Sequence, residues 1–152
     1  MIRATTPADV EYIHERMKPL QRRSLLGTSY SLDCRDAIPR TGVTIERDGR
    51  PVAIAGAVIT HPGVASTFFY STDEMGRCIV EITRYFLDLF REMAAMGVHR
   101  VHALSLAEDY AGRKWKEQCL GAEVEAVLHK YGRNGEDYIL HRLILEPPGD
   151  IL

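Results

Sequence analysis

Apolar and polar positions alternate in residues 43–45, which is the pattern of a strand with one buried face. Asp48-Gly49 follows, a dipeptide typical of a tight hairpin turn, and residues 52–58 resume the strand pattern. Pro62-Gly63 then leads into a third run, residues 64–71. Together these segments predict a three-stranded antiparallel meander.

Elsewhere the spacing of apolar residues becomes three and four. Residues 79–93 follow the period of an amphipathic helix, and Gly97 is a typical residue just beyond a helix end. Near the N-terminus, residues 1–4 predict a short strand. Thr5-Thr6-Pro7 supplies a hydroxyl cap and a first-turn proline, which predicts a helix running to about Lys18.

The rest of the chain adds further elements in a regular order. Residues 20–38 are irregular and rich in Arg, Ser and Asp, which predicts one or two short surface helices. The later segments read as a strand over residues 98–106, a helix over residues 108–119, and strands over residues 124–131 and 138–145.

This order predicts one α/β domain over residues 1–152. Residues 64–106 form a strand–helix–strand unit, which we expect to be a parallel, right-handed crossover. The predicted sheet is therefore mixed and mostly antiparallel, with its fourth and fifth strands parallel and helices on both faces.

Composition narrows the class of protein. The chain has 26% charged and 45% hydrophobic residues, which argues against disorder, and its net charge of −2 lacks the footprint of a general nucleic-acid binder. Residues 51–72 carry no charged side chain, but His61-Pro62-Gly63 in their middle predicts two strands and a turn, so we expect no membrane span. Three widely spaced cysteines without a CxxC motif favour a reduced, cytoplasmic location. The sequence contains no zinc-ligand spacing, so we expect no metal site.

The order of elements, with their lengths, resembles the GCN5-related N-acetyltransferase (GNAT) superfamily over nearly the whole chain. The segments that carry the resemblance are IRATTPADVEYI at the start, GVTIERDGRPVAIAGAVI in the meander, and WKEQCLGAEVEAVLHKYGRNGEDYILHRL near the C-terminus. STFFYST and YGRNGEDYILHRL look most like the divergent branch that tailed bacteriophages encode. If the chain were phage-encoded, it would act in the host cytoplasm or in the virion.

The resemblance implies acetyl-CoA, or another acyl-CoA, as co-substrate. It would bind where the fourth and fifth strands diverge, with its pyrophosphate at the start of the next helix, which residues 72–78 would form. The positions implied for this role are Phe69, Tyr70, Ser71, Thr72, Gly76 and Arg77. The loop has one glycine and two acids, Asp73 and Glu74, where the family has more glycine, and Arg77 with Arg84 would supply compensating charge.

The family's chemistry also implies groups that move protons. A base takes the proton of the acceptor amine, and a tyrosine often protonates the departing thiolate. The candidate bases are His61, Glu108 and Asp109; Tyr110 is the tyrosine near the later helix, while Trp115 lies near the position where the family often has one. Each has a structural alternative, namely a strand end for His61 and a helix cap for the two acids.

Two functional hypotheses remain open from the sequence. The first is an N-acyltransferase that moves an acyl group to an amine on a small molecule or macromolecule; the second is a catalytically lapsed binding or structural protein, such as a virion component. Four basic residues cluster in the segment that would border the acceptor site: Arg22, Arg23, Arg35 and Arg40. They either favour an acidic or nucleic-acid acceptor, or they simply form a solvated face. A homo-oligomer also remains open. The lapsed protein would have a cleft filled by Phe69, Tyr70 and Met75.

Overall fold

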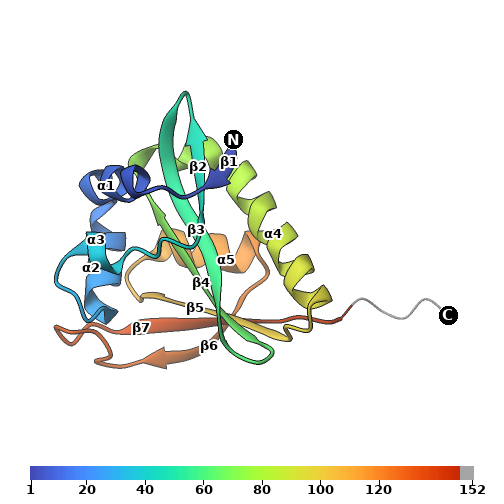
Figure 1. Cartoon of the computed structure of the whole chain (residues 1–152). Coiled ribbons are helices and arrows are strands. Elements are labelled where there is room, and N and C mark those ends of the chain that lie inside the picture. The colour runs from blue at the N-terminus through green and yellow to red at the C-terminus, as the bar shows by residue number, and fades with distance from the viewer. Residues whose placement is uncertain (148–152) are drawn as a thin grey trace.

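The protein forms a seven-stranded sheet in the order β1-β2-β3-β4-β5-β7-β6 in a computed structural model that describes residues 1–147 (Figure 1). The strands are β1 (Ile2–Ala4), β2 (Val43–Arg47), β3 (Arg50–His61), β4 (Val64–Ser71), β5 (Arg100–Leu106), β6 (Glu123–Leu128) and β7 (Tyr138–Ile144). Only β4 and β5 are parallel neighbours among these; the other five pairings are antiparallel. The predicted mixed sheet with parallel fourth and fifth strands is confirmed.

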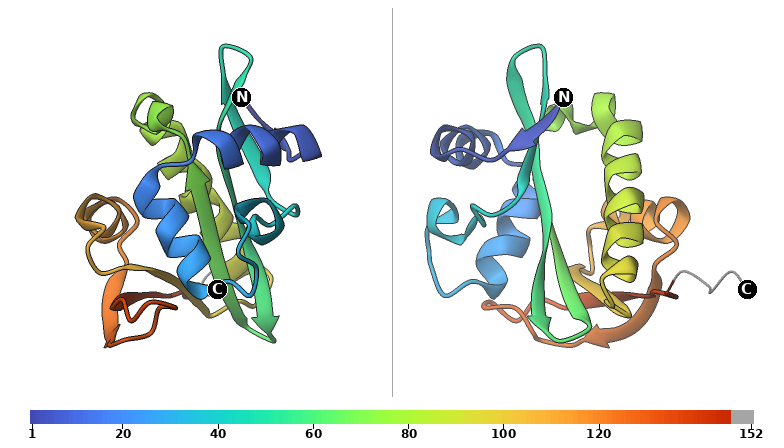
Figure 2. Two further views of the ribbon diagram at one scale, coloured as in Figure 1. Left: turned by 90° about the vertical axis from the view of Figure 1, so that its left-hand side faces the viewer. Right: turned by 45° about the vertical axis from the view of Figure 1, so that its right-hand side comes forward.

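Helices cover both faces of the sheet, as predicted. They are α1 (Pro7–Arg16), α2 (Pro19–Thr28), α3 (Cys34–Ala37), α4 (Ile79–Ala95) and α5 (Tyr110–Cys119), with a 3₁₀ helix, η1 (Asp73–Cys78), between β4 and α4. Figure 2 shows α1, α2 and α3 on one face and α4 and α5 on the other. Successive strand residues therefore face different layers: Ala53 and Ala55 pack with α4, whereas Ile54 packs with α1.

Turn chemistry explains the two hairpins of the meander. Asp48 and Gly49 both have positive φ angles, 53° and 75°, the combination that a tight two-residue hairpin turn requires. Gly63 has a φ of 83°, and an added Cβ there would lie 2.2 Å from the ring of His99. A side chain at this turn would require the ring of His99 to move, in addition to the strain of the positive φ angle.

Several boundaries differ from those predicted. Pro19, which is expected only to interrupt the first helix, is also the first residue of α2. A proline is tolerated there because the amide hydrogen at the first position of a helix has no partner within the helix. β3 extends to His61, and β6 ends at Leu128 because Lys130 takes a positive φ of 55°. The predicted helix start over residues 72–78 is a separate 3₁₀ helix before α4.

A close contact with β7 holds helix α2 against the half of the sheet that contains β5 and β7. The hydroxyl of Tyr138 donates to the carbonyl of Ser24 at 2.9 Å. A Cβ added to Gly27 would lie 2.2 Å from that same hydroxyl oxygen, so the glycine lets the helix approach the tyrosine. This contact places α2 over β7 and beside β5, where the site described below opens.

The start of α1 is fixed by Asp9, whose residue is 3% exposed. Its carboxylate accepts from Arg3 Nη1 and Nη2 at 2.7 and 2.8 Å, from the Thr6 amide at 2.8 Å and from the Thr44 hydroxyl at 3.0 Å. Burial alone would raise the pKa of Asp9, but these hydrogen bonds outweigh it and hold the pKa well below its usual range. The carboxylate thus ties β1, α1 and β2 together.

We expect Asp9→Ala to lower the free energy of unfolding by about 3 kcal/mol, because it leaves Arg3 and two buried donors without their acceptor. In the wild type, the contribution of Asp9 is present above the unfolded pKa of 3.8 and declines as the pH falls below it, because the folded pKa is depressed. Urea unfolding between pH 7 and pH 3 measures both effects. An equal acid sensitivity in wild type and variant would contradict this role.

Candidate active site

The strands β4 and β5 lie side by side over a short distance and then separate. They pair in parallel at Val64↔Arg100, Ala65↔Val101 and Ser66↔His102. Beyond these three pairs each strand keeps only its outer partner within the described residues: β4 pairs with β3 as far as Ser71, and β5 pairs with β7 as far as Leu106. The divergence opens a gap in the middle of the sheet, as Figure 1 shows between β4 and β5.

A cavity of about 740 Å³ occupies this gap and reaches both faces of the sheet. We name it the splay cavity. On one face its walls include residues of α2 such as Gln21 and Leu25, and on the other they include Phe86 of α4 and Trp115 of α5. The cavity is therefore a passage through the sheet between the two helical layers.

Phe69 and Tyr70 of β4 line the splay cavity from opposite faces. The Phe69 ring packs against the rings of Phe86 and Trp115, with centroids 6.1 and 5.5 Å apart. The Tyr70 ring stacks on Phe68 in the other layer, and burial raises the pKa of its phenol to about 12. These side chains and Met75 form walls around an open cavity, which does not favour the hypothesis of a filled, lapsed cleft.

The backbone of β4 presents hydrogen-bonding groups to the gap. The Thr72 amide donates to the carbonyl of Val52 at 2.9 Å, so Thr72 faces β3. Because alternate residues of a strand face opposite neighbours, Ser71 and Phe69 face the gap. The Ser71 amide donates to Oε1 of Gln21 at 2.7 Å, which closes that end, and the backbone of Phe69 is left toward the cavity.

The loop that follows β4 arranges its two acids away from the splay cavity. Glu74 forms an ion pair with Arg50 of β3 at 2.8 Å, and Asp73 is exposed. Thr72, the residue before η1, accepts from the Glu74 amide at 3.3 Å through its side-chain oxygen. Gly76 is exposed, and a Cβ added there would meet nothing within 4 Å, so the chain itself does not demand a glycine.

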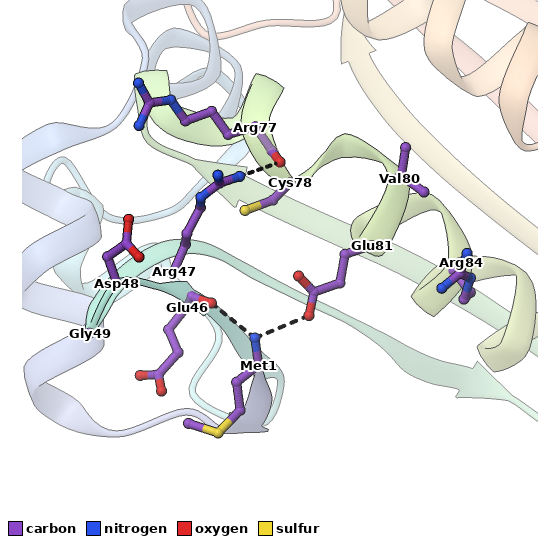
Figure 3. A pocket seen from close by; sticks show the side chains of 10 residues that line it. All are labelled: Met1, Glu46, Arg47, Asp48, Gly49, Arg77, Cys78, Val80, Glu81 and Arg84. Atoms are coloured by element: carbon purple, nitrogen blue, oxygen red, sulfur yellow. Dashed lines mark hydrogen bonds and ion pairs between the residues drawn. The ribbon is translucent and has the colours of Figure 1, made fainter.

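Arg77 and Arg84 line a second hollow instead of the splay cavity. This hollow, the hairpin pocket, has a volume of about 700 Å³ and is drawn in Figure 3. Arg47 Nη1 donates to the backbone carbonyl of Arg77 at 2.8 Å, and the amino group of Met1 pairs with Glu81 at 3.1 Å. The hairpin pocket is therefore ringed by charges of both signs.

The three predicted catalytic side chains do not line the splay cavity. His61 is exposed at the end of β3, with its Nδ1 at 3.2 Å from the Thr60 hydroxyl. Glu108 pairs with Arg23 of α2 at 2.6 Å, and Tyr110 is 72% exposed. Asp109 does line the cavity, but its carboxylate also caps α5 by accepting from the Gly112 amide at 3.1 Å.

Several polar residues that the sequence analysis did not assign to the site also line the splay cavity, among them Ser105, His102, His141 and Lys116. Burial, then the charge of Arg100, lowers the pKa of His102, which keeps its imidazole neutral at pH 7. The signal that points to His141 is a polar residue at a strand position whose neighbours two residues away, Ile139 and Leu143, face the core.

Within residues 1–147, no group of three or more His, Cys, Asp or Glu side chains is placed to hold a metal ion. Over the same described part of the chain, no helix has the length and apolar character needed to cross a membrane.

The fold is that of N-acetyltransferases of known structure. A ribosomal-protein-alanine N-acetyltransferase from Brucella melitensis matches with a TM-score of 0.65 and 18% identity, over 95% of this chain and 99% of that one. An N-acetyltransferase from Staphylococcus aureus Mu50 matches with a TM-score of 0.72 and 17% identity, over 96% of this chain and 98% of that one. A structure from Salmonella typhimurium, determined with its cofactor acetyl-CoA, matches with a TM-score of 0.67 and 16% identity, over 98% of this chain and 95% of that one. At such identities the likeness establishes a GNAT-like fold, and the sequence matches no family model and no curated protein.

We expect Phe69→Ala to reduce the free energy of unfolding by about 2–3 kcal/mol, because the ring of Phe69 supports Phe86 and Trp115 at the wall of the cavity. Chemical denaturation measures the loss. Tyr30→Ala is the matched control: Tyr30 is 108% exposed, so its truncation changes stability by less than about 0.5 kcal/mol. Equal losses in the two variants would contradict the packing role of Phe69.

Proposed function

We propose that this protein is an acyl-CoA-dependent N-acyltransferase, which moves an acetyl or related acyl group from the thioester to an amine acceptor by direct attack. The observation that carries the proposal is the splay of β4 and β5 after three residue pairs, with a cavity that joins both faces of the sheet. The fold shared with N-acetyltransferases, including one determined with acetyl-CoA, supports the same conclusion.

In this proposal the acyl-CoA takes the place of a strand beside β4. The amide and carbonyl of Phe69 would pair with the amide groups of the pantetheine arm, as a neighbouring strand would. The pyrophosphate would lie near Thr72, which precedes η1, and near Gly76, which lies within η1. Glu74 is held toward β3 by Arg50, which reduces its repulsion of the pyrophosphate.

The acceptor amine would reach the thioester from the α2 face of the splay cavity. Alignment of two reactants can supply effective molarities of roughly 10⁵–10⁸ M, whereas a general base adds about 10²–10⁴-fold. In this proposal the amine's proton would pass to His102 or Asp109, both of which line the splay cavity. We keep His61, Glu108 and Tyr110 as outer residues that would act only on an acceptor extending beyond the cavity.

The basic residues near α2 are largely engaged by acidic or carbonyl groups. Arg23 pairs with Glu108, Arg35 pairs with Asp33, and a guanidinium nitrogen of Arg22 donates to the carbonyl of His14. This engagement favours an amine acceptor recognised without a phosphate backbone, either a small molecule or a protein amine. We propose that the reaction takes place in the cytoplasm.

We expect acetyl-CoA to stabilise the protein by roughly 2.7 kcal/mol at about 100 times its dissociation constant. Thermal unfolding measures this. The fluorescence of Trp115, the only tryptophan, gives a second readout at the cavity wall. ATP at the same concentration is the control for nonspecific nucleotide binding. If neither signal responds to millimolar acetyl-CoA or related thioesters, the proposed function is wrong.

We expect Ala103→Phe, which places a ring in the splay cavity, to weaken acetyl-CoA binding by at least about tenfold, or about 1.4 kcal/mol. Val124→Phe is the matched control, because it adds a ring at a 41% exposed position of β6. Titration of Trp115 fluorescence compares the two affinities. Equal affinity in Ala103→Phe and wild type would place the donor outside the splay cavity.

A further inference from the structure

A group of polar side chains lines the α4–α5 end of the splay cavity without satisfying its hydrogen-bonding capacity. His141 of β7 is 1% exposed and Ser105 of β5 is 5% exposed. Both ring nitrogens of His141 and the hydroxyl of Ser105 lack a hydrogen-bond partner within residues 1–147. Because His141 pairs with Ala103 in the sheet register, His141 and Ser105 lie diagonally on one face.

Buried polar groups without partners are costly in a folded protein, so their presence along a cavity wall points to a ligand that supplies the partners. The approach of His141 Nε2 to Glu117 Oε2, at 3.7 Å, is too long for a hydrogen bond. Burial, then the charge of Lys116, lowers the pKa of His141, so its ring is a neutral proton acceptor at pH 7.

Lys116 of α5 brings an amine to the same wall. It is half-buried, and burial lowers the pKa of its ammonium from 10.5 to about 8, although Asp109 opposes the shift. About half of the amine is therefore neutral at pH 8, more than about a hundred times the neutral fraction of a solvated lysine. The other titratable and charged groups that act on this pair are Arg113 and Glu117 of α5.

We infer that Lys116 is a site of self-acylation: when an acyl-CoA occupies the splay cavity, the side-chain amine of Lys116 accepts the acyl group. This inference rests on the proposed function, because that function supplies the thioester. The position of Lys116 carries it, since the amine shares with Phe69 the cavity in which the thioester would lie.

The reaction balances without a further reagent. The neutral nitrogen of Lys116 attacks the thioester carbonyl carbon, the N–C bond forms, and the C–S bond breaks. An unpartnered ring nitrogen of His141 takes the proton from the attacking nitrogen, and that proton passes to the CoA thiolate, which leaves as the thiol. The product amide carries no charge and adds an acyl group to the cavity wall, so the modification limits later donor binding.

The test is incubation of the purified full chain with acetyl-CoA at pH 8, followed by intact-mass measurement and peptide mapping. We expect one acetyl group per chain, located at Lys116, and a rate that rises with pH through about 8 because only the neutral amine attacks. Lys116→Arg should abolish the adduct, and His141→Gln should slow its formation by at least about tenfold. Lys114→Arg, an exposed position on the same helix, is the matched control and should behave as wild type.

Mapping of the wild type suffices even if a variant fails to fold. If acetyl-CoA shifts the unfolding temperature or Trp115 fluorescence while Lys116 stays unmodified, the self-acylation inference is overturned and the proposed function stands. Equal acetylation of the exposed Lys114 and Lys130 would also overturn it, because it would indicate reaction in bulk solvent. If no donor binds at all, both fail together.

Discussion

A parallel strand pair that separates inside a sheet leaves backbone donors and acceptors without partners, and the rest of this structure is arranged around that constraint. The N-terminal end of α2 satisfies part of it, because the carbonyl of Ser71 accepts from the Lys18 amide at 3.2 Å and its amide donates to Gln21. β7 holds β5 along its whole length, and the contact between Tyr138 and Ser24 joins β7 to α2. The gap persists because its borders are fixed on both sides, and on the β4 side the backbone near Phe69 is left for a ligand.

Burial shifts the pKa values of four side chains of the splay cavity in the direction that favours their neutral forms. It lowers the pKa values of His102, His141 and Lys116 and raises that of Tyr70, so each group is shifted toward its neutral form. A neutral environment suits the proposed chemistry, because a thioester is uncharged and an amine attacks only after it has lost its proton. The same burial that disfavours charged side chains in the cavity therefore favours the amine's reactive form.

The features that local sequence could predict are those that depend on neighbours along the chain. Asp48-Gly49 gave the hairpin, and β4 ends where the apolar run ends, at Ser71. The site residues are harder to predict from the sequence, because contacts such as that between Glu108 and Arg23 join residues 85 positions apart, and no local pattern encodes them. Arg77 is predicted beside a phosphate, and the structure shows it at the wall of the hairpin pocket, near the end of η1.

The two-sided form of the splay cavity has a consequence for competition between acceptors. An external amine approaching from the α2 face and Lys116 on the α5 face would meet the same thioester from opposite sides of the sheet. Lys116 is covalently held at the wall, so it needs no encounter and loses little freedom on reacting. An external acceptor prevails only if it binds well enough to be aligned while the donor is present, so self-acylation would be fastest when no acceptor occupies the α2 side.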